Sequence, residues 1–449
     1  MSAVPAATPS SLDALLRRGP YQAYSYSYPH KSAYRALAVP RALADVWAGE
    51  DRSALFAYVH VPFCSMRCGF CNLFAMAQPH DDLVDRYVAA VVRQMQAVDE
   101  ALGERRFVRL ALGGGTPSYL SAAQLERLYS ALAQRLGIDL QGTPSGIEVS
   151  PETVTADRLA VCRTMGVDRV SMGVQSFSDA EVRALARPQQ NTTVVAAVEA
   201  IRRAGFPVLN LDLIYGIAGQ TLASWASSLD SALALAPEEI YLYPLYVRER
   251  TGLGKLAIRR GAEPVDDRPA MYALACERLA AAGYVQVSMR MFRAPHAPAD
   301  AGPAYSCQTD GMVGLGAGAR SYTSRLHYSS HYAVDRVATR DIVERFAEGD
   351  LAHFATVDYG FELDGEEQRR RFAIQSLLSQ PGLVAADYRA RFGSDWADDL
   401  PQLTELAARG LAHDDGQLLA LTAAGLARAD TLGPWLVSDG VARRMDAGC

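Results

Sequence analysis

Short apolar segments alternate with helical patterns after residue 50, and this alternation limits the possible folds more than any other feature of the sequence. Helices are predicted over 81–101 and 121–136, where apolar residues recur at helical spacing. Strands separated by helices form parallel sheets, so an α/β fold is expected. Six such units favour an incomplete (β/α)6 barrel, although a doubly wound sheet has the same alternation. The predicted strands are 54–61, 107–112, 146–149, 169–173, 208–215 and 239–243.

Two flanking regions lack this alternation. The first 50 residues are rich in tyrosine and show no long helix before Ala42. From about residue 359 the pattern is helical, and AspAspGlyGln (414–417) separates two short apolar runs, which is typical of a small winged-helix-like domain. The predicted organisation is an N-terminal arm at 1–50, a barrel at 51–250, a barrel extension at 251–358 and a C-terminal domain at 359–449.

Composition argues against several classes of partner. Lys plus Arg minus Asp plus Glu is 44 − 50 = −6, and no run of like charge marks a surface for nucleic acid or an anionic membrane. The first residues lack the pattern of a secretory signal, and no apolar stretch is long enough for a membrane span. Apart from one cluster, the seven cysteines are scattered, as in a protein of a reducing compartment. We therefore expect a cytoplasmic protein that binds a small-molecule or natural-product substrate.

Three cysteines, Cys64, Cys68 and Cys71, lie in one short segment directly after the first predicted strand. Pro62 and Gly69 disfavour a continuous helix there, so a loop would present the three sulfur atoms to one inorganic centre. A structural zinc site needs four ligands, and His60 would be the nearest fourth. A [4Fe–4S] cluster is normally held by four thiolates, so three would leave one iron open to a substrate or cofactor. Both interpretations are open at this point.

The segment CysSerMetArgCysGlyPheCys (64–71) resembles the CxxxCxxC loop of the radical SAM superfamily, and LeuGlyGlyGlyThrPro (112–117) resembles its glycine motif. The resemblance implies a [4Fe–4S] cluster whose open iron binds S-adenosylmethionine (SAM). It implies reductive cleavage of SAM to a 5′-deoxyadenosyl radical that abstracts hydrogen from an organic substrate. A reductase or flavodoxin is the implied electron donor.

Further motifs resemble the oxygen-independent coproporphyrinogen III oxidases (HemN) and the related haem chaperones (HemW), and they extend over most of the chain. From the residues alone, Glu148, Gln175 and Asp212 end or follow predicted strands, so they are expected in one cavity that suits ribose hydroxyls and an ammonium group. The resemblance does not identify a catalytic residue. It implies contacts to the cluster-bound SAM from Tyr58, Phe70, Gly114 and Glu148, and contacts to a second SAM from Gly115, Thr116, Gln175, Arg187 and Asp212. The matching segments are 27–29, 58–64, 113–120, 147–151, 171–177, 212–216 and 314–318.

Two departures separate the chain from both relatives. Asn72 and Leu73 follow Cys71, where the oxidases continue as CxC, and TyrSerCysGlnThrAsp (305–310) stands where the chaperones carry HNxxYW. The resulting hypothesis is a divergent HemN-like radical SAM enzyme of porphyrin or natural-product metabolism, with methyl transfer from a second SAM as one option. The alternatives are coproporphyrinogen III oxidase activity, a haem chaperone of the HemW type and a zinc-stabilised binding module.

Overall fold

The computed structural model describes residues 11–24, 26–187, 189–248, 251–254, 266–299, 310–333 and 335–447. They divide into two compact units, each treated separately below. The larger unit takes its described residues from Ala36–Gln286 and Arg290–Gly360, and the smaller unit takes its own from Met1–Arg35, Val287–Met289 and Phe361–Cys449. No helix among the described residues combines the length and the apolar character that a membrane-spanning helix needs.

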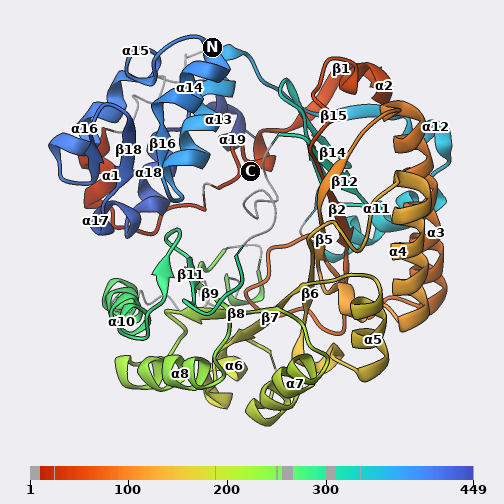
Figure 1. Ribbon diagram of the computed structural model, residues 1–449, viewed down its shortest axis with the longest axis horizontal. Coiled ribbons are helices and arrows are strands. Elements are labelled where there is room, and N and C mark those ends of the chain that lie inside the picture. Colours follow the sequence, from red (N-terminus) through yellow and green to blue (C-terminus); the bar gives the residue numbers. More distant parts are fainter. Residues whose placement is uncertain are drawn as a thin grey trace, which may run out of the picture. The chain divides into compact units, whose positions relative to one another are not determined.

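Six parallel strands form the centre of the larger unit, and each overlaps one of the predicted strands. Neighbouring strands in this set pair in parallel from β2 through to β9. In Figure 1 these strands form a curved sheet, as expected for a partial (β/α)6 barrel. The strands are β2 (Leu55–Val61), β5 (Phe107–Gly114), β6 (Ser145–Val149), β7 (Arg169–Gln175), β8 (Val208–Tyr215) and β9 (Glu239–Pro244).

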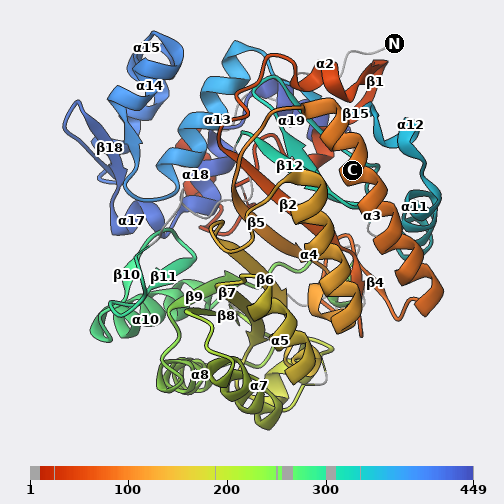
Figure 2. The same ribbon diagram turned by 45° about the vertical axis from the view of Figure 1, so that its right-hand side comes forward.

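Helices cover the outer face of this curved sheet, as Figure 2 shows for α3, α4, α5, α7 and α8. The strands contribute fully buried apolar side chains such as Leu112, Ile147 and Leu211 to the layer between sheet and helices. Helix α4 begins with a capping box at Ser121 and ends at Gly137, whose φ of +69° closes the helix. The helices are α3 (Asp81–Leu102), α4 (Ala122–Leu136), α5 (Ala156–Thr164), α6 (Asp179–Ala184), α7 (Asn191–Arg203), α8 (Leu222–Ala234) and α10 (Arg268–Ala281).

Short strands extend the sheet at both edges, which the sequence pattern did not predict. Beyond β9 lie the antiparallel strands β11 (Met291–Arg293) and β10 (Val285–Gln286). Beyond β2 lies β12 (Met312–Leu315), which pairs with β2 in parallel. With four further strands at this edge, the sheet has thirteen strands among the described residues. The remaining elements of this edge are β13 (Arg320–Tyr322), β14 (Leu326–Ser329), β15 (Thr356–Glu362), β1 (Arg35–Ala42), α2 (Leu43–Trp47), α11 (Arg336–Glu348) and α12 (Leu351–Phe354).

The smaller unit combines helices with a three-stranded sheet in the order β16, β18, β17. The AspAspGlyGln turn joins β17 to β18, and Asp414 and Asp415 accept hydrogen bonds from backbone N–H groups within it. This hairpin is the one expected for a winged-helix-like domain. The elements are α1 (Leu12–Arg17), α13 (Gly365–Leu377), β16 (Leu383–Val384), α14 (Ala385–Phe392), α15 (Trp396–Asp399), α16 (Thr404–Ala408), β17 (Ala412–Asp414), β18 (Leu418–Leu421), α17 (Ala423–Leu426), α18 (Ala429–Trp435) and α19 (Asp439–Asp446).

Part of the predicted arm belongs to this smaller unit. Tyr28 is buried, and its hydroxyl donates a hydrogen bond to Glu367 on α13. Ser438 donates to the other oxygen of Glu367 at 2.6 Å, and Arg371 donates to the carbonyl of Tyr28 at 2.6 Å. Burial, together with the adjacent Glu367 charge, raises the pKa of Tyr28, so its hydroxyl stays a donor. These bonds fix residues near 28 against α13 and the start of α19.

Candidate active site

The cysteine-bearing segment leaves the barrel at the carboxyl end of β2 and returns next to its own starting point. Strand β3 (Phe63–Cys64) pairs in parallel with β4 (Met76–Ala77). The Met76 N–H donates to the Pro62 carbonyl at 2.6 Å, and the Gln78 N–H donates to the Cys64 carbonyl at 2.9 Å. The residues between β3 and β4 therefore form a loop whose base is closed by backbone hydrogen bonds. We call residues 64–75 the cysteine loop.

Contacts on two sides hold this loop in place. The Gly69 N–H donates to the Leu185 carbonyl, and the Leu253 N–H donates to the Gly69 carbonyl, both at 2.9 Å. A Cβ at Gly69 would lie 3.0 Å from the Leu185 oxygen, so glycine permits this close approach. On the other side the Tyr332 hydroxyl donates to the Asn72 carbonyl at 2.6 Å. The sulfur atoms are thus presented by a fixed loop.

Polar groups from the barrel approach two of the three thiols. Thr116 Oγ1 donates to Cys64 Sγ at 3.5 Å, and Arg187 Nη1 lies 3.8 Å from Cys68 Sγ. Burial raises the pKa of the Cys64 thiol to about 12, and charge on Cys71 and Cys68 adds to this effect. Such a thiol becomes a thiolate only when a bound metal displaces its proton.

The donor set fits a cluster that binds each thiolate through a different iron atom. All three thiols are half-buried and belong to one short loop, and each is a free cysteine. Within the described ranges, no three or more His, Cys, Asp and Glu side chains are arranged to hold a single metal ion. His60, the candidate fourth zinc ligand, is buried. Its Nε2 lies 2.9 Å from the Phe74 carbonyl oxygen, and its Nδ1 lies 3.4 Å from the Tyr58 hydroxyl.

The glycine motif lies directly under the cysteine loop. The Gly115 N–H donates to the Val61 carbonyl at 2.8 Å. A Cβ at Gly115 would lie 2.7 Å from the Phe63 carbonyl oxygen and 3.0 Å from Cys64 Sγ. Gly114 has a φ of +116°, and a Cβ there would lie 2.7 Å from the His60 ring. Only glycine allows the backbone to pass between His60 and the base of the loop.

Glu148 lies against this motif from the end of β6. Its Oε2 accepts a hydrogen bond from the Gly114 N–H at 3.0 Å. A Cβ at Gly113 would be 3.0 Å from both Glu148 Oε1 and the Tyr58 hydroxyl, so these two side chains meet above Gly113. Burial raises the pKa of Glu148 to about 7, and the charge of Asp212 raises it further. The pKa of Asp212 is raised to about 6, mainly by burial, while a 2.8 Å hydrogen bond from Asn210 opposes the shift.

Gln175 and Arg187 both lie beside Gly173, and Arg187 also approaches Cys68. Gln175 has a φ of +70°, and its amide nitrogen would be 2.6 Å from a Cβ at Gly173. Arg187 Nη2 donates to the Gly173 carbonyl at 2.8 Å, while Nη1 faces Cys68. The positive charge of Arg187 lowers the pKa of Asp212, which indicates that the two side chains are near each other.

Most of the predicted site residues are therefore linked by direct contacts or by neighbouring charges. Phe70 differs, because it packs against an apolar cluster that includes Leu185, Ile214 and Leu245. Residues 305–309 of the segment compared with the chaperone motif, including Cys307, lie outside the described residues. The predicted residues that these contacts and charges link are Tyr58, Cys64, Cys68, Gly114, Gly115, Thr116, Glu148, Gln175, Arg187 and Asp212.

The barrel interior also holds charged residues that the sequence reasoning missed. Arg169 Nε lies 2.8 Å from Glu239 Oε2, and both side chains are buried. Arg293 Nη1 lies 3.6 Å from the other oxygen of Glu239. The charge of Arg169 lowers the pKa of both Glu148 and Asp212. The available signal was a charged residue at the start of an apolar run, since Arg169 and Glu239 are the first residues of the predicted strands 169–173 and 239–243.

The raised pKa of Glu148 predicts a pH-dependent stability. At pH values between 4.5, the ordinary pKa of a glutamate, and about 7, the Glu148 carboxyl holds a proton in the folded state and releases it in the unfolded state. The free energy of unfolding therefore falls as pH rises through this range. Glu148→Gln removes this loss and keeps an oxygen acceptor for Gly114. One pKa unit corresponds to about 1.4 kcal/mol, so we expect the variant to be more stable by about 1 kcal/mol or more at pH 8.

Thermal unfolding at pH 5 and pH 8, without added SAM, measures this difference. The advantage of Glu148→Gln should shrink at pH 5, where the wild-type carboxyl is protonated. Glu126→Gln on α4 makes the same change at an exposed position and should leave the unfolding temperature unchanged at both pH values. An equal shift at both pH values would show that the effect does not come from ionisation of Glu148.

Comparison with known proteins gives the same picture as the geometry. Residues 58–232 match the radical SAM superfamily model, and residues 363–428 match the HemN C-terminal domain model. An oxygen-independent coproporphyrinogen III oxidase of Pseudomonas aeruginosa is 30% identical over 81% of this chain and 81% of its own length. The haem chaperone HemW of Bacillus subtilis is 27% identical over 80% of this chain and 92% of its own.

A solved structure shows the same fold. The coproporphyrinogen III oxidase HemN of Escherichia coli superposes with a TM-score of 0.75 at 24% identity, covering 93% of this chain and 99% of that one. The family brings with it a [4Fe–4S] cluster and SAM, which suit the cysteine loop and the carboxylates beside it. By motifs, sequence identity and fold, this chain is a radical SAM enzyme that belongs to the HemN-like family.

Proposed function

We propose that Cys64, Cys68 and Cys71 hold the [4Fe–4S] cluster, and that SAM binds against the glycine motif and Glu148. When bound, the cluster and SAM together supply a carbon radical that takes hydrogen from an organic substrate. The single observation that supports this most is the contact between the cysteine loop and the glycine motif, with the Glu148 carboxylate on the Gly114 N–H. The barrel region predicted at 51–250 would carry both cofactors, with 1–50, 251–358 and 359–449 as arm, extension and C-terminal domain.

The proposed contacts to the cluster-bound SAM are Tyr58, Phe70, Gly114 and Glu148. Above pH 7 the Glu148 carboxylate is ionised and can accept hydrogen bonds from an ammonium group. Tyr58 lies beside the same carboxylate and offers a hydroxyl. Phe70 belongs to an apolar surface that suits the face of an adenine ring.

A second SAM is proposed beside the first, held by Gly115, Thr116, Gln175, Arg187 and Asp212. Support comes from Arg187, which lies 3.8 Å from Cys68 Sγ and adjoins Gly173 together with Gln175, and from the neighbouring charges of Arg187 and Asp212. A SAM molecule bound at this second site would serve as the methyl donor for a methyl transfer reaction. S-Adenosylhomocysteine released together with 5′-deoxyadenosine would support that option.

For the substrate we propose a tetrapyrrole or a natural product. The relatives named above act on coproporphyrinogen III or chaperone haem. Coproporphyrinogen III oxidation is therefore the first specific activity to test, and haem binding without turnover is the second.

Anaerobic reconstitution with iron and sulfide, followed by reduction in the presence of SAM, tests the proposal. We expect about four irons per chain and release of 5′-deoxyadenosine. Adding coproporphyrinogen III tests decarboxylation, and adding haem tests retention. A colourless protein that binds zinc and leaves SAM intact under strong reductant would overturn the proposal.

A further inference from the structure

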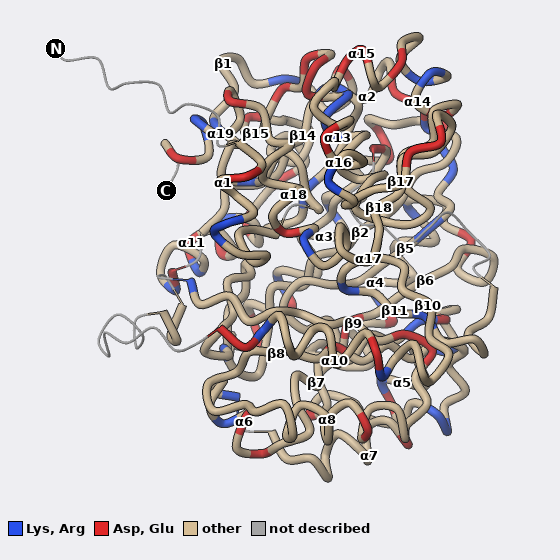
Figure 3. Tube along the Cα trace, turned by 90° about the vertical axis from the view of Figure 1, so that its left-hand side faces the viewer, with Lys and Arg blue, Asp and Glu red and all other residues tan. Residues whose placement is uncertain are grey.

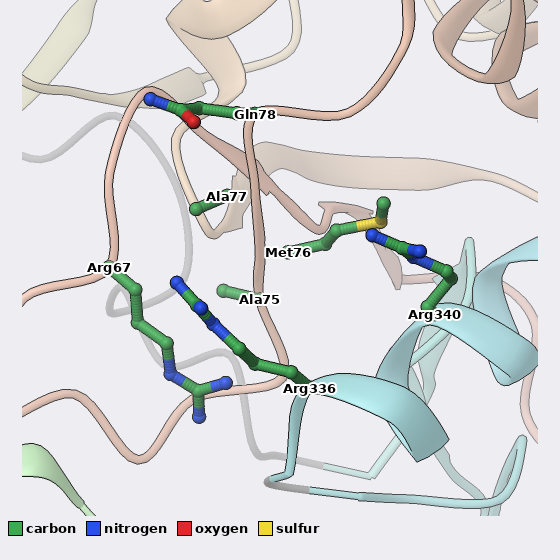
Figure 4. A pocket seen from close by; sticks show the side chains of 7 residues that line it. All are labelled: Arg67, Ala75, Met76, Ala77, Gln78, Arg336 and Arg340. Carbon is green, nitrogen blue, oxygen red and sulfur yellow. The ribbon is translucent and has the colours of Figure 1, made fainter.

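A cavity of about 240 Å³ opens beside the cysteine loop, and three arginines line it without any carboxylate. Figure 4 shows the guanidinium groups of Arg67, Arg336 and Arg340 around Ala75 and Met76. Arg67 belongs to the cysteine loop, while Arg336 and Arg340 belong to α11. The cavity thus combines the small or apolar side chains of 75–77 and the amide of Gln78 with three positive charges, which fits an acidic group on a partner molecule.

The cavity adjoins the centre that must receive an electron. Arg67 directly precedes Cys68, and the residues from Ala75 to Gln78 carry the chain back past Cys64, whose carbonyl accepts the Gln78 N–H at 2.9 Å. The loop is exposed near this point, because half of the Leu73 side chain is accessible to solvent. A redox partner seated here would lie close to the cysteine loop.

The positions of the two α11 arginines are not explained by helix stability. Arg336 and Arg340 lie one turn apart, where like charges repel. They also lie at the start of the helix, where the helix dipole favours negative charge. Asp335 caps the helix through a 2.9 Å hydrogen bond from the Ala338 N–H. On a chain of net charge −6, this local group of arginines is a site that attracts anions.

We propose that this cavity is the docking point of an acidic flavodoxin-type electron carrier, an inference that rests on the proposed function. The carrier gives up one electron and the cluster gains it, and no other co-reactant is required. Carboxylates of the carrier would enter the cavity and pair with the arginines. Leu73 lies two residues before Ala75, and Val337 directly follows Arg336. These side chains, which are 50% and 70% exposed, would supply apolar contact to a protein partner.

The test compares two reductants on the reconstituted full-length protein at low salt. Reduced flavodoxin needs a docking surface, whereas reduced methyl viologen is a small cation that does not need this one. In the double variant Arg336→Glu/Arg340→Glu, we expect kcat/KM for flavodoxin to fall at least tenfold, because electrostatic steering of the carrier is lost. The rate of 5′-deoxyadenosine formation with methyl viologen should stay unchanged. Added salt should slow the wild type with flavodoxin and leave the variant little affected.

Arg345→Glu is the matched control, because it reverses an exposed charge on the same helix outside the cavity. It should retain most of the flavodoxin-supported rate. Equal flavodoxin kinetics in the double variant and the wild type would overturn the docking site while leaving the proposed function intact. A loss of the same size with methyl viologen would also overturn it. Failure of the wild type with both reductants would instead contradict the proposed function.

Discussion

Replacing Cys68 with alanine is expected to abolish cluster binding and SAM cleavage together. The loop would keep two thiolates, and the nearest other candidate ligand, His60, has its ring nitrogens against Phe74 and Tyr58. Iron content after anaerobic reconstitution should fall from about four per chain to near background, and 5′-deoxyadenosine should become undetectable. Iron and sulfide analysis, visible absorption and chromatography of the nucleoside products measure the three effects.

Cys276→Ala is the control for this loss. Cys276 is half-buried within α10, and the substitution removes the same sulfur without touching the cysteine loop. This variant should bind iron and cleave SAM as the wild type does. The unfolding temperatures of Cys68→Ala and the wild type, both free of iron, should agree closely, which would locate the defect at the site. A Cys68→Ala protein that keeps both the cluster and cleavage would contradict the role of this thiol.

The central barrel could be predicted because its signals are local. Each of the six strands is a short apolar run next to a helical pattern, and parallel strands separated by helices leave few alternatives. The cysteine loop and the glycine motif are also contiguous in sequence, and both lie where a strand ends. The contact between Gly115 and the base of the loop follows from two neighbouring parallel strands, β2 and β5.

Long-range pairing explains most of what the sequence did not show. Strands β10 to β14 have between two and four residues each, which is too short for a periodic pattern. Strand β12 pairs with β2 across more than 200 residues of sequence. The Arg169–Glu239 ion pair joins residues 70 positions apart. The bonds from Tyr28 and Ser438 to Glu367 likewise group part of the arm with the C-terminal helices, which no local pattern indicates.

Gly115→Ala is expected to cause the second large loss, through shape alone. The added methyl group would lie 2.7 Å from the Phe63 carbonyl oxygen and 3.0 Å from Cys64 Sγ, so the start of the cysteine loop must shift. Overpacking of this kind costs about 1–3 kcal/mol of stability. The displaced Cys64 sulfur should lower SAM cleavage more than tenfold, since a misplacement near 1 Å can cost about 100-fold. Iron analysis and 5′-deoxyadenosine formation after reconstitution measure the effect.

Gly49→Ala makes the same substitution where a Cβ would meet nothing within 4 Å, and it should change neither stability nor activity. The comparison separates crowding at the cysteine loop from a general cost of replacing glycine. A Gly115→Ala protein with normal iron content and normal cleavage would show that the loop can move without harm. Because the Gly115 N–H is bonded to Val61 and the Thr116 N–H to Phe63, both at 2.8 Å, we expect the backbone to have little room for such movement.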